Sequence, residues 1–427
     1  MKVLLLAGEE SGVLYAERLR RALPGCEFKT YQDHYKTSDL AVMGFWAVIK
    51  RLFFFLGVQR TMKRIIREWK PDVVVTIDYP GLNLKLAAYA KARGIPAVHL
   101  VCPQVWAWHQ GRIPKVAAAV NRLLCFFPFE PALFKEYEGK DFHAAFIGHP
   151  MVDIFEEEKK LGVVGAEAHH ESAGPEARHP DLAAGLCARK SDLAAGLCAR
   201  KSDLDAGLRA RRCEIALLPG SRVGEIQRHL PRLLDAVGLL KRPDIRVVIP
   251  AANDRAEAEI RATITARNDS FTPEVVKGGA RDLLRQADCA AVASGTATLE
   301  AALARCPTVL VYAVSPLLAW FARRVITGVK HIGLANVIAE KSGVEPPMPE
   351  LLQEAFTPEA VAAQLGAWLS DAEARARASR ALDAVMARLG VAGVSPANET
   401  RSPGASVPVG GALGLAAREI MEVARAH

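Results

Sequence analysis

Two short segments in the second half of the chain combine small residues with a charged side chain at spacings suited to phosphate binding. Residues 217–222 read LLPGSR and residues 293–300 read ASGTATLE, and each follows an apolar run typical of a buried parallel strand. Such turns bring backbone N–H groups to the start of a helix, where they bind anions. The predicted pyrophosphate ligands are the side chain of Arg222 and the amides around Ser294, Gly295 and Thr296.

Glu300 lies in the second segment, about a turn and a half into the predicted helix. Its carboxylate is in a position to accept hydrogen bonds from ribose hydroxyls. The alternative is that both segments are ordinary glycine-containing turns between a strand and a helix. Two such turns in one domain, one with an Arg and the other with a Glu, favour binding instead. The predicted ligand is therefore a nucleotide or a nucleotide sugar.

A third candidate lies in the first half of the chain. Asp78 follows the apolar run of residues 73–77 and precedes a YPGLN segment at residues 79–83. Ligands of open parallel sheets bind outside the carboxyl ends of the strands, so the Asp78 carboxylate is predicted to project into a cleft between domains. The alternative is that Asp78 caps the turn that follows it.

The elements that position these residues alternate between strand and helix in both halves, which is the pattern of parallel sheets covered by helices. Helices are predicted at residues 14–23 and 62–69. The predicted strands are residues 2–7, 72–77, 97–102, 122–126, 146–147, 214–218, 246–249, 289–293 and 308–312. The predicted fold class is α/β, with two Rossmann-like doubly wound domains that face a central cleft.

Two stretches interrupt this pattern. Residues 181–202 contain the unit DLAAGLCARKS twice, and a degenerate third copy follows. Eleven residues nearly close three helical turns, but each unit contains a glycine, so we interpret residues 161–212 as an inserted, poorly ordered linker without chemistry. The predicted divisions are residues 1–160 (acceptor and membrane binding), 161–212 (inserted linker), 213–386 (nucleotide-sugar binding), 387–412 (flexible linker) and 413–427 (a terminal helix packing back on the first domain).

Composition narrows the classes of partner. The net charge of +8 comes without zinc-finger spacing, an RNP-like strand or a long basic run, which excludes nucleic acid and leaves anionic membranes and phosphorylated substrates. Eight cysteines lack a C-x-x-C pair or nearby His spacing, so idle thiols in a reducing cytoplasm are expected. Residues 1–8 are interpreted as a first strand and not as a signal peptide.

Residues 43–58 form the most hydrophobic stretch of the first half, but Lys50 and Arg51 interrupt it and it is too short to span a bilayer. As a helix it carries an aromatic face typical of an interfacial helix, with basic residues for lipid phosphates. The alternative is a core helix; three consecutive phenylalanines favour the membrane, because consecutive helical positions cannot all face one core. The predicted membrane contacts are Phe45, Trp46, Ile49, Phe53, Phe54 and Leu56.

These segments, together with residues 101–112 (VCPQVWAWHQGR), 127–130 (FPFE) and 146–150 (FIGHP), resemble the lipid-A-disaccharide synthase family. The match starts at residues 8–12 (GEESG) and extends in order to about residue 365, apart from the inserted stretches. The resemblance implies a hexosyltransferase of the GT-B type on the cytoplasmic face of the inner membrane. It would join UDP-2,3-diacylglucosamine to 2,3-diacylglucosamine 1-phosphate, called lipid X, and release UDP. No metal or other cofactor is expected, and the possibility of a homodimer is left open.

The resemblance also implies roles for individual residues. Asp78 matches the catalytic base, which takes the proton of the lipid X 6-hydroxyl as that oxygen attacks the anomeric carbon with inversion. Arg222 and the amides of the second segment meet the charge that develops on UDP. Asn336 is also expected among the residues that bind the donor, the UDP-sugar. The expected acceptor or second-line residues are Ser11, Asn83, Trp106, Trp108, His109, Arg112 and His149. The alternative for the two histidines is a structural hydrogen bond. The alternative for the two tryptophans is an ordinary position in the hydrophobic core.

Several positions depart from the family pattern, mostly in the acceptor half. Val13 stands where Asp is usual, Gly81 and Leu82 replace Asp and Phe, and residues 27–40 are too short for the usual Gly-Pro-containing loop. In the donor half the changes are Ala335, where Pro is usual, and additions around residues 343–348. A second hypothesis is therefore a divergent nucleotide-sugar-binding protein with an altered acceptor or lost transfer activity.

Overall fold

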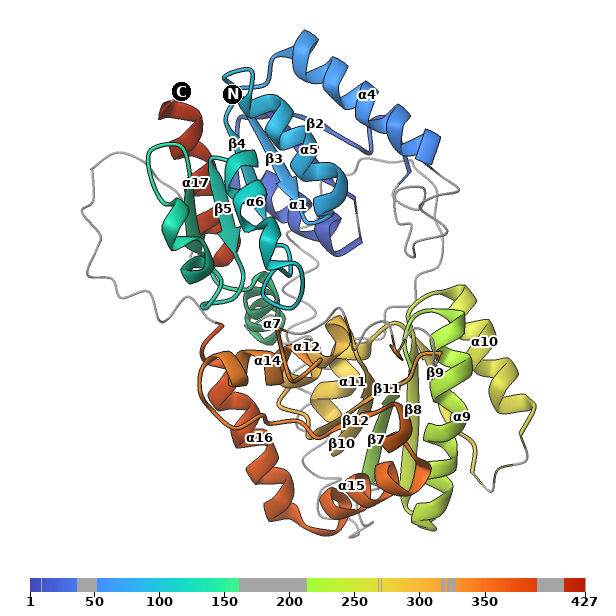
Figure 1. The fold of residues 1–427 in the computed structure, drawn as a ribbon. Helices are drawn as coiled ribbons and strands as arrows, with labels where there is room; N and C mark the ends of the chain where they lie inside the picture. Colours follow the sequence, from blue (N-terminus) through green and yellow to red (C-terminus); the bar gives the residue numbers. More distant parts are fainter. Residues whose placement is uncertain are drawn as a thin grey trace, which may run out of the picture.

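The computed structural model describes residues 1–8, 10–36, 52–160, 213–267, 269, 271–315, 319–320, 324, 328–389 and 411–426. These residues form two α/β domains, each built on a six-stranded parallel sheet (Figure 1). The predicted class of two Rossmann-like domains is confirmed. The eleven-residue repeat and residues 390–410 lie outside the described residues.

The first sheet has the strand order β2-β1-β3-β4-β5-β6, with every neighbouring pair parallel. Its strands are β1 (Lys2–Ala7), β2 (Glu27–Thr30), β3 (Val73–Ile77), β4 (Ala97–Leu100), β5 (Arg122–Cys125) and β6 (His143–Phe146). The central strands β1 and β3 are nearly continuous Val, Leu and Ile runs, because helices cover both of their faces. The strand order reverses between β1 and β3, and ligands of such sheets bind at this switch point.

Helices cover the two faces of this sheet. One face carries α1 (Glu10–Ala22), α7 (Pro150–Lys160) and α17 (Ala412–Ala426); the other carries α4 (Leu52–Trp69), α5 (Pro80–Lys91) and α6 (Ile113–Ala119). Two short 3-10 helices, η1 (Gln110–Arg112) and η2 (Pro131–Tyr137), complete the domain. In Figure 1 the C-terminal helix α17, in red, lies among the elements of the first domain, and its buried Leu413, Ile420 and Val423 join the core around α1.

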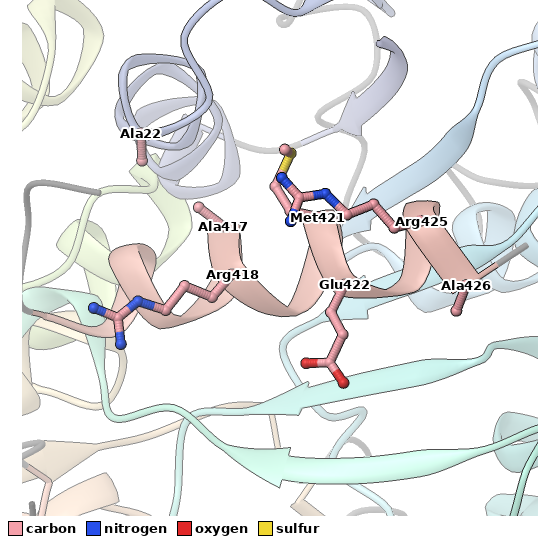
Figure 2. A pocket seen from close by; sticks show the side chains of 7 residues that line it. All are labelled: Ala22, Ala417, Arg418, Met421, Glu422, Arg425 and Ala426. Atoms are coloured by element: carbon pink, nitrogen blue, oxygen red, sulfur yellow. The ribbon is translucent and has the colours of Figure 1, made fainter. Parts of the chain in front are cut away.

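A pocket opens between α1 and α17. Its lining residues are Ala22 of α1 and, from α17, Ala417, Arg418, Met421, Glu422, Arg425 and Ala426 (Figure 2). Helix α1 begins after the carboxyl end of β1 and ends at Ala22, so the pocket lies toward the amino ends of the strands. It is therefore remote from the switch point between β1 and β3.

The second sheet has the order β12-β11-β10-β7-β8-β9 and is also parallel throughout. Its strands are β7 (Cys213–Leu218), β8 (Ile245–Ala251), β9 (Glu274–Lys277), β10 (Cys289–Ala293), β11 (Thr308–Tyr312) and β12 (Glu350–Leu352). The order reverses between β7 and β10. The segments that follow these two strands are the two predicted phosphate-binding segments, so both lie at the switch point.

Helices α9 (Val223–Leu240), α10 (Asp254–Thr265) and α15 (Pro358–Ser370) pack on one face of this sheet. The other face carries α11 (Ala280–Gln286), α12 (Thr296–Leu303), α14 (Leu334–Lys341) and α16 (Ala372–Met386). A 3-10 helix, η3 (Gln353–Ala355), follows β12.

The two domains touch through several specific contacts. Glu158 at the end of α7 forms ion pairs with Arg285 at 2.6 Å and Arg281 at 3.2 Å, and both arginines belong to α11. The backbone N–H of Gly328 donates to the carbonyl of Ala107 at 3.1 Å. The first domain therefore contacts the second through α7 and through the segment that follows β4.

Candidate active site at the domain interface

Charged side chains of both domains act on one buried tyrosine of the first domain. Tyr15 of α1 is buried, and burial together with the negative charges of Glu300 and Asp78 raises its pKa, while Arg281 lowers it. Tyr15 and Asp78 belong to the first domain, and Glu300 and Arg281 to the second. Sequence reasoning did not single out Tyr15; its place on the helix that follows β1 at the switch point is the signal that identifies it.

Asp78 occupies a strained turn at the end of β3. Its φ is 51° and that of Tyr79 is 53°, so two consecutive residues other than glycine adopt the left-handed conformation. The Asp78 N–H donates to the carbonyl of Leu100 at 3.0 Å, and α5 begins with Pro80, whose fixed φ suits the first turn of a helix. Burial raises the pKa of Asp78, and the N–H of Tyr79 partly offsets this.

Arg222 lies at the start of α9, beside the switch point. Gly220 precedes it with φ of +114°, and a Cβ there would lie 2.8 Å from the Cβ of Glu225, so only glycine fits. Arg222 pairs with Glu225 at 2.6 Å, yet 54% of its side chain remains exposed. The guanidinium therefore stays accessible to a phosphate while Glu225 limits its orientation.

The second segment starts α12. Gly295 has φ of +150°, a conformation open to glycine alone, and both Gly295 and Thr296 are exposed. The backbone N–H of Ser294 donates to the carbonyl of Val311 at 3.2 Å, so this N–H is occupied within the sheet, and donor binding by the rest of Ser294 stays a prediction. Gly295 and Thr296 remain as the amide donors. Glu300 is half-buried in the same helix; burial raises its pKa, Arg281 lowers it and Glu158 raises it further.

Asn336, expected among the donor ligands, is fully buried in α14. Its amide nitrogen donates to the carbonyl of Met348 and to Glu350, both at 2.8 Å, and its oxygen accepts from the N–H of Met348 at 3.0 Å. The expectation of a direct contact is therefore corrected, because these protein groups occupy the amide. Asn336 instead holds Glu350, which accepts from the backbone of Ile332 and Gly333.

His149 is a core residue. Burial lowers its pKa to about 3, so the ring is neutral near pH 7, and its Nδ1 accepts from the N–H of Met151 at 3.2 Å. The ring packs against Phe126 and Phe127, with centroids 5.1 and 5.8 Å apart. The structural alternative therefore describes His149 better than the expected acceptor-side or second-line role.

Trp106 is also buried, with its indole nitrogen donating to Glu130 at 3.0 Å and its ring in the core cluster shared with the second domain. Trp106 therefore lies in the core of the domain interface, which agrees with the core alternative and not with the expected acceptor-side role. The other acceptor-side candidates are accessible. Ser11, Trp108 and His109 are exposed, and Arg112 is half-buried. The rings of Trp108 and His109 lie 4.8 Å apart.

Glu130 belongs to a buried cluster with two thiols. Its carboxylate accepts from Trp106 and from the backbone N–H groups of Phe126 and Phe127, each at 3.1 Å. Cys102 and Cys125 lie nearby with potential ligand atoms for a metal. Their thiols donate to the carbonyls of Pro103 and Leu123. Because these atoms already have hydrogen-bond partners and burial raises the pKa of Cys125, we assign no metal to this cluster.

Asn83, expected on the acceptor side, is fully buried in α5. Its amide nitrogen donates to backbone carbonyls, and its oxygen accepts from the Tyr31 hydroxyl at 2.8 Å. The expectation that Asn83 contacts the acceptor directly is therefore corrected. Its side chain instead contacts the strained turn that carries Asp78.

Helix α4 presents an aromatic end to solvent. Phe53 is 87% exposed and Leu56 is 37% exposed, whereas Phe54 and Phe55 are half-buried. The ring of Phe55 lies 6.2 Å from that of Tyr79, next to Asp78. The expected contacts Phe45, Trp46 and Ile49 lie outside the described residues.

The same helix face continues with basic residues. Arg60 and Arg64 are exposed and follow Phe53 and Leu56 at helical spacing. Figure 1 shows α4 along the outer edge of the first domain. Among the described residues, no helix is both long and apolar enough to cross a bilayer.

Comparison with known families decides the identity of this arrangement. A protein-family model described as lipid-A-disaccharide synthetase matches residues 3–199 and 199–391. The chain belongs to the lipid-A-disaccharide synthase family. The lipid-A-disaccharide synthase of Saccharophagus degradans is 32% identical over 86% of this chain and 87% of its own length. That of Syntrophus aciditrophicus is 33% identical over 92% of this chain and 94% of its own.

Solved structures support the fold of this lipid-A-disaccharide synthase family member. The UDP-GlcNAc 2-epimerase of Neisseria meningitidis bound to UDP-GlcNAc has a TM-score of 0.52 at 11% identity and covers 91% of this chain and 99% of its own. The glycotransferase of kitacinnamycin has a TM-score of 0.54 at 13% identity and covers 99% of this chain and 98% of its own. At such identities the likeness concerns the fold alone.

Proposed function

We propose that the chain is an inverting glycosyltransferase of lipid A biosynthesis that condenses UDP-2,3-diacylglucosamine with lipid X. The products are the lipid A disaccharide 1-phosphate and UDP. The observation that carries the proposal is membership of this family over most of the chain, with the charges of Asp78 and Glu300, from opposite domains, both acting on the buried Tyr15. A site shared between domains suits a reaction that joins two separate sugars.

The donor site of the proposal lies at the switch point of the second sheet. The pyrophosphate of UDP accepts hydrogen bonds at the start of α12, where Gly295 and Thr296 are exposed, and from Arg222. Glu300 accepts from the ribose hydroxyls. These groups also meet the charge that develops on the departing UDP, so the proposal includes neither a metal nor another cofactor.

Asp78 is the proposed general base. The 6-oxygen of lipid X forms a bond to the anomeric carbon of the donor sugar as the bond from that carbon to the UDP oxygen breaks, and the hydroxyl proton passes to Asp78. Burial raises the pKa of Asp78, which makes its carboxylate a stronger base than one in water. A single displacement of this kind inverts the configuration at the anomeric carbon.

The proposed membrane contact is the exposed face of α4. Both proposed substrates carry acyl chains, so they reside in a lipid surface. Phe53 and Leu56 enter the acyl boundary, and Arg60 and Arg64 meet anionic headgroups of the cytoplasmic leaflet. This face belongs to the domain that carries Asp78.

One observation supports a second candidate function. In it, the protein transfers the sugar to a different acceptor or has lost transfer activity. A Cβ added at Gly81 would meet no atom within 4 Å, so this position beside Asp78 is open where the family usually carries a carboxylate. Val13, where Asp is usual, packs partly buried against the core. Both changes lie in the acceptor half.

A product assay separates the two functions. Purified protein is mixed with UDP-2,3-diacylglucosamine and lipid X in detergent, and products are identified by mass spectrometry. Asp78→Ala and Asp78→Asn are tested beside Asp72→Asn, a matched aspartate at the amino end of the same strand. We expect the disaccharide 1-phosphate from the wild type and Asp72→Asn only.

The other outcomes identify which part of the proposal is wrong. Full transfer by Asp78→Asn would remove Asp78 as the base. Absence of product from a folded wild-type protein that still binds UDP would favour the second candidate function.

A further inference from the structure

A buried side-chain amide, that of Asn83, donates to the strained turn that carries Asp78. We infer that Asn83, oriented by Tyr31, is a positioning residue that keeps the backbone of Asp78 and Tyr79 left-handed and so directs the Asp78 carboxylate toward the domain interface. The inference rests on the proposed role of Asp78 as the base. Neither Asn83 nor Tyr31 contacts a substrate in it, because both are buried in the first domain.

The amide nitrogen of Asn83 faces three carbonyl oxygens at the junction of two strands and the turn. It lies 2.7 Å from the carbonyl of Asp78, 3.1 Å from that of Ile77 and 3.3 Å from that of Leu6. An amide nitrogen carries two hydrogens, so these acceptors compete for them, and the shortest contact is with Asp78. One side chain thus joins β1, the last residue of β3 and the base.

Tyr31 determines which end of the amide faces the turn. Its hydroxyl donates to the Asn83 oxygen at 2.8 Å, which leaves the nitrogen to face the carbonyls. The tyrosine is fully buried beside Leu4, Leu6 and Leu86 in the core beneath α4 and α5. The short segment after β2 therefore supplies a fixed support for the catalytic turn.

This support matters because the turn is unfavourable by itself. Left-handed backbone is disfavoured for residues with a Cβ, and here two follow each other. If the Asn83 donor is lost, the Asp78 carbonyl loses its closest partner in a half-buried turn. We expect the turn to relax and the Asp78 carboxylate to change its orientation.

Kinetics of the full chain test the inference with two variants. Tyr31→Phe removes only the hydroxyl that orients the amide, and Asn83→Ser removes the amide itself. We expect kcat to fall about 5-fold in the first and about 10- to 100-fold in the second, since small misplacements of reacting groups have effects of this size. KM for the donor and the affinity for UDP by calorimetry stay within about 2-fold, because Arg222 and Glu300 lie in the other domain.

The pH profile of kcat is a second measurement. A loss of stability alone would lower kcat but would not shift the pH at which it falls. Burial raises the pKa of Asp78, and the N–H of Tyr79 lowers it; the negative charge of Asp78 acts on Tyr15, as do the charges of Glu300 and Arg281 from the second domain. When the turn relaxes, water reaches the carboxylate, so the acid limb of kcat moves to lower pH. Asn121→Ser is the matched control: Asn121 is a buried amide that accepts from Ala97 at the amino end of β4.

The outcomes separate this inference from the proposed function. Asp78→Ala is measured in parallel, and full activity there would overturn the base and, with it, the positioning role. If Asp78→Ala is inactive but Tyr31→Phe and Asn83→Ser retain wild-type kcat, only the positioning role is wrong. It is equally wrong if Asn83→Ser and Asn121→Ser lower kcat alike with an unmoved acid limb. A fall in kcat with a shifted limb for the Asn83 and Tyr31 variants alone supports it.

Discussion

The indole nitrogen of Trp106 donates to the buried carboxylate of Glu130 at 3.0 Å. The same carboxylate accepts from two consecutive backbone N–H groups after β5. Trp106 packs in the cluster shared with the second domain, and the neighbouring Ala107 accepts from Gly328 of that domain. Glu130 therefore fixes one of the segments through which the first domain meets the second.

Removal of this carboxylate is predicted to destabilise the protein strongly. Glu130→Ala leaves three buried N–H donors without their acceptor, and each such group costs about 1–3 kcal/mol. We expect the free energy of unfolding, measured with urea, to fall by about 3 kcal/mol or more. Glu136→Ala, at an exposed position of η2, is the control and stays within about 0.5 kcal/mol of wild type. A Glu130→Ala variant as stable as that control would contradict the prediction.

The same residue predicts how stability depends on pH. Burial raises the pKa of Glu130 from its ordinary value of 4.5 to about 8. Between these values the folded state retains a proton that the unfolded state has released, so the contribution of Glu130 to stability falls as pH rises from 4.5 toward 8. We expect Glu130→Gln to lack this fall when unfolding is measured across that range. Parallel pH profiles for the two proteins would show that Glu130 does not titrate there.

The activity is predicted to fall on the acid side because the proposed base must be ionised. Since burial raises the pKa of Asp78 above its ordinary value of 3.8, kcat decreases as pH falls through the raised value. The measurement is kcat at saturating substrates across pH, which reports groups in the enzyme–substrate complex. An acid limb at or below the ordinary aspartate value would contradict the desolvated base.

Glu300→Ala is predicted to weaken UDP binding. The loss of a charged acceptor for ribose hydroxyls typically costs about 1.5–3 kcal/mol, which corresponds to an increase in Kd of about 10- to 150-fold. Isothermal titration calorimetry with UDP measures this directly. The matched control is Glu359→Ala, an exposed glutamate in the first turn of α15. Unchanged UDP affinity in Glu300→Ala would remove Glu300 from the donor site.

Membrane association is predicted to depend on the exposed end of α4. A variant with Phe53→Ser and Leu56→Ser loses two exposed apolar side chains, and we expect its binding to anionic vesicles to fall about 10-fold or more in co-sedimentation. Leu239→Ser is the control, because this leucine is 46% exposed on α9 of the other domain. Equal sedimentation of all three proteins would exclude α4 as the contact.

The sequence predicted those parts of the site that depend on local order along the chain. The strands before Arg222, Ser294 and Asp78 are continuous apolar runs, and small residues follow two of them, so both the parallel sheets and their ligand-facing ends were predictable. The short edge strands β2, β9 and β12 were missed, because few residues and partial burial leave little hydrophobic pattern.

What the sequence did not predict depends on partners distant along the chain. Asn83 and Asn336 have the polar character of ligands, but tertiary packing buries them and backbone groups occupy their amides. His149 is neutral because aromatic rings surround it. The link of Tyr15 to the site depends on the charge of Glu300, which belongs to the second domain and is distant along the chain.

The contact between Phe55 and Tyr79 gives the proposed reaction a two-dimensional character. Helix α4, the proposed lipid contact, and Tyr79, the residue next to the proposed base, are joined by this ring pair. In the proposal, an acceptor that diffuses laterally in the leaflet therefore reaches the base without leaving the plane of the membrane. For such an enzyme the relevant concentration is the mole fraction of acceptor in the surface. Dilution of lipid X with inert lipid then slows the reaction even when its amount per volume is constant.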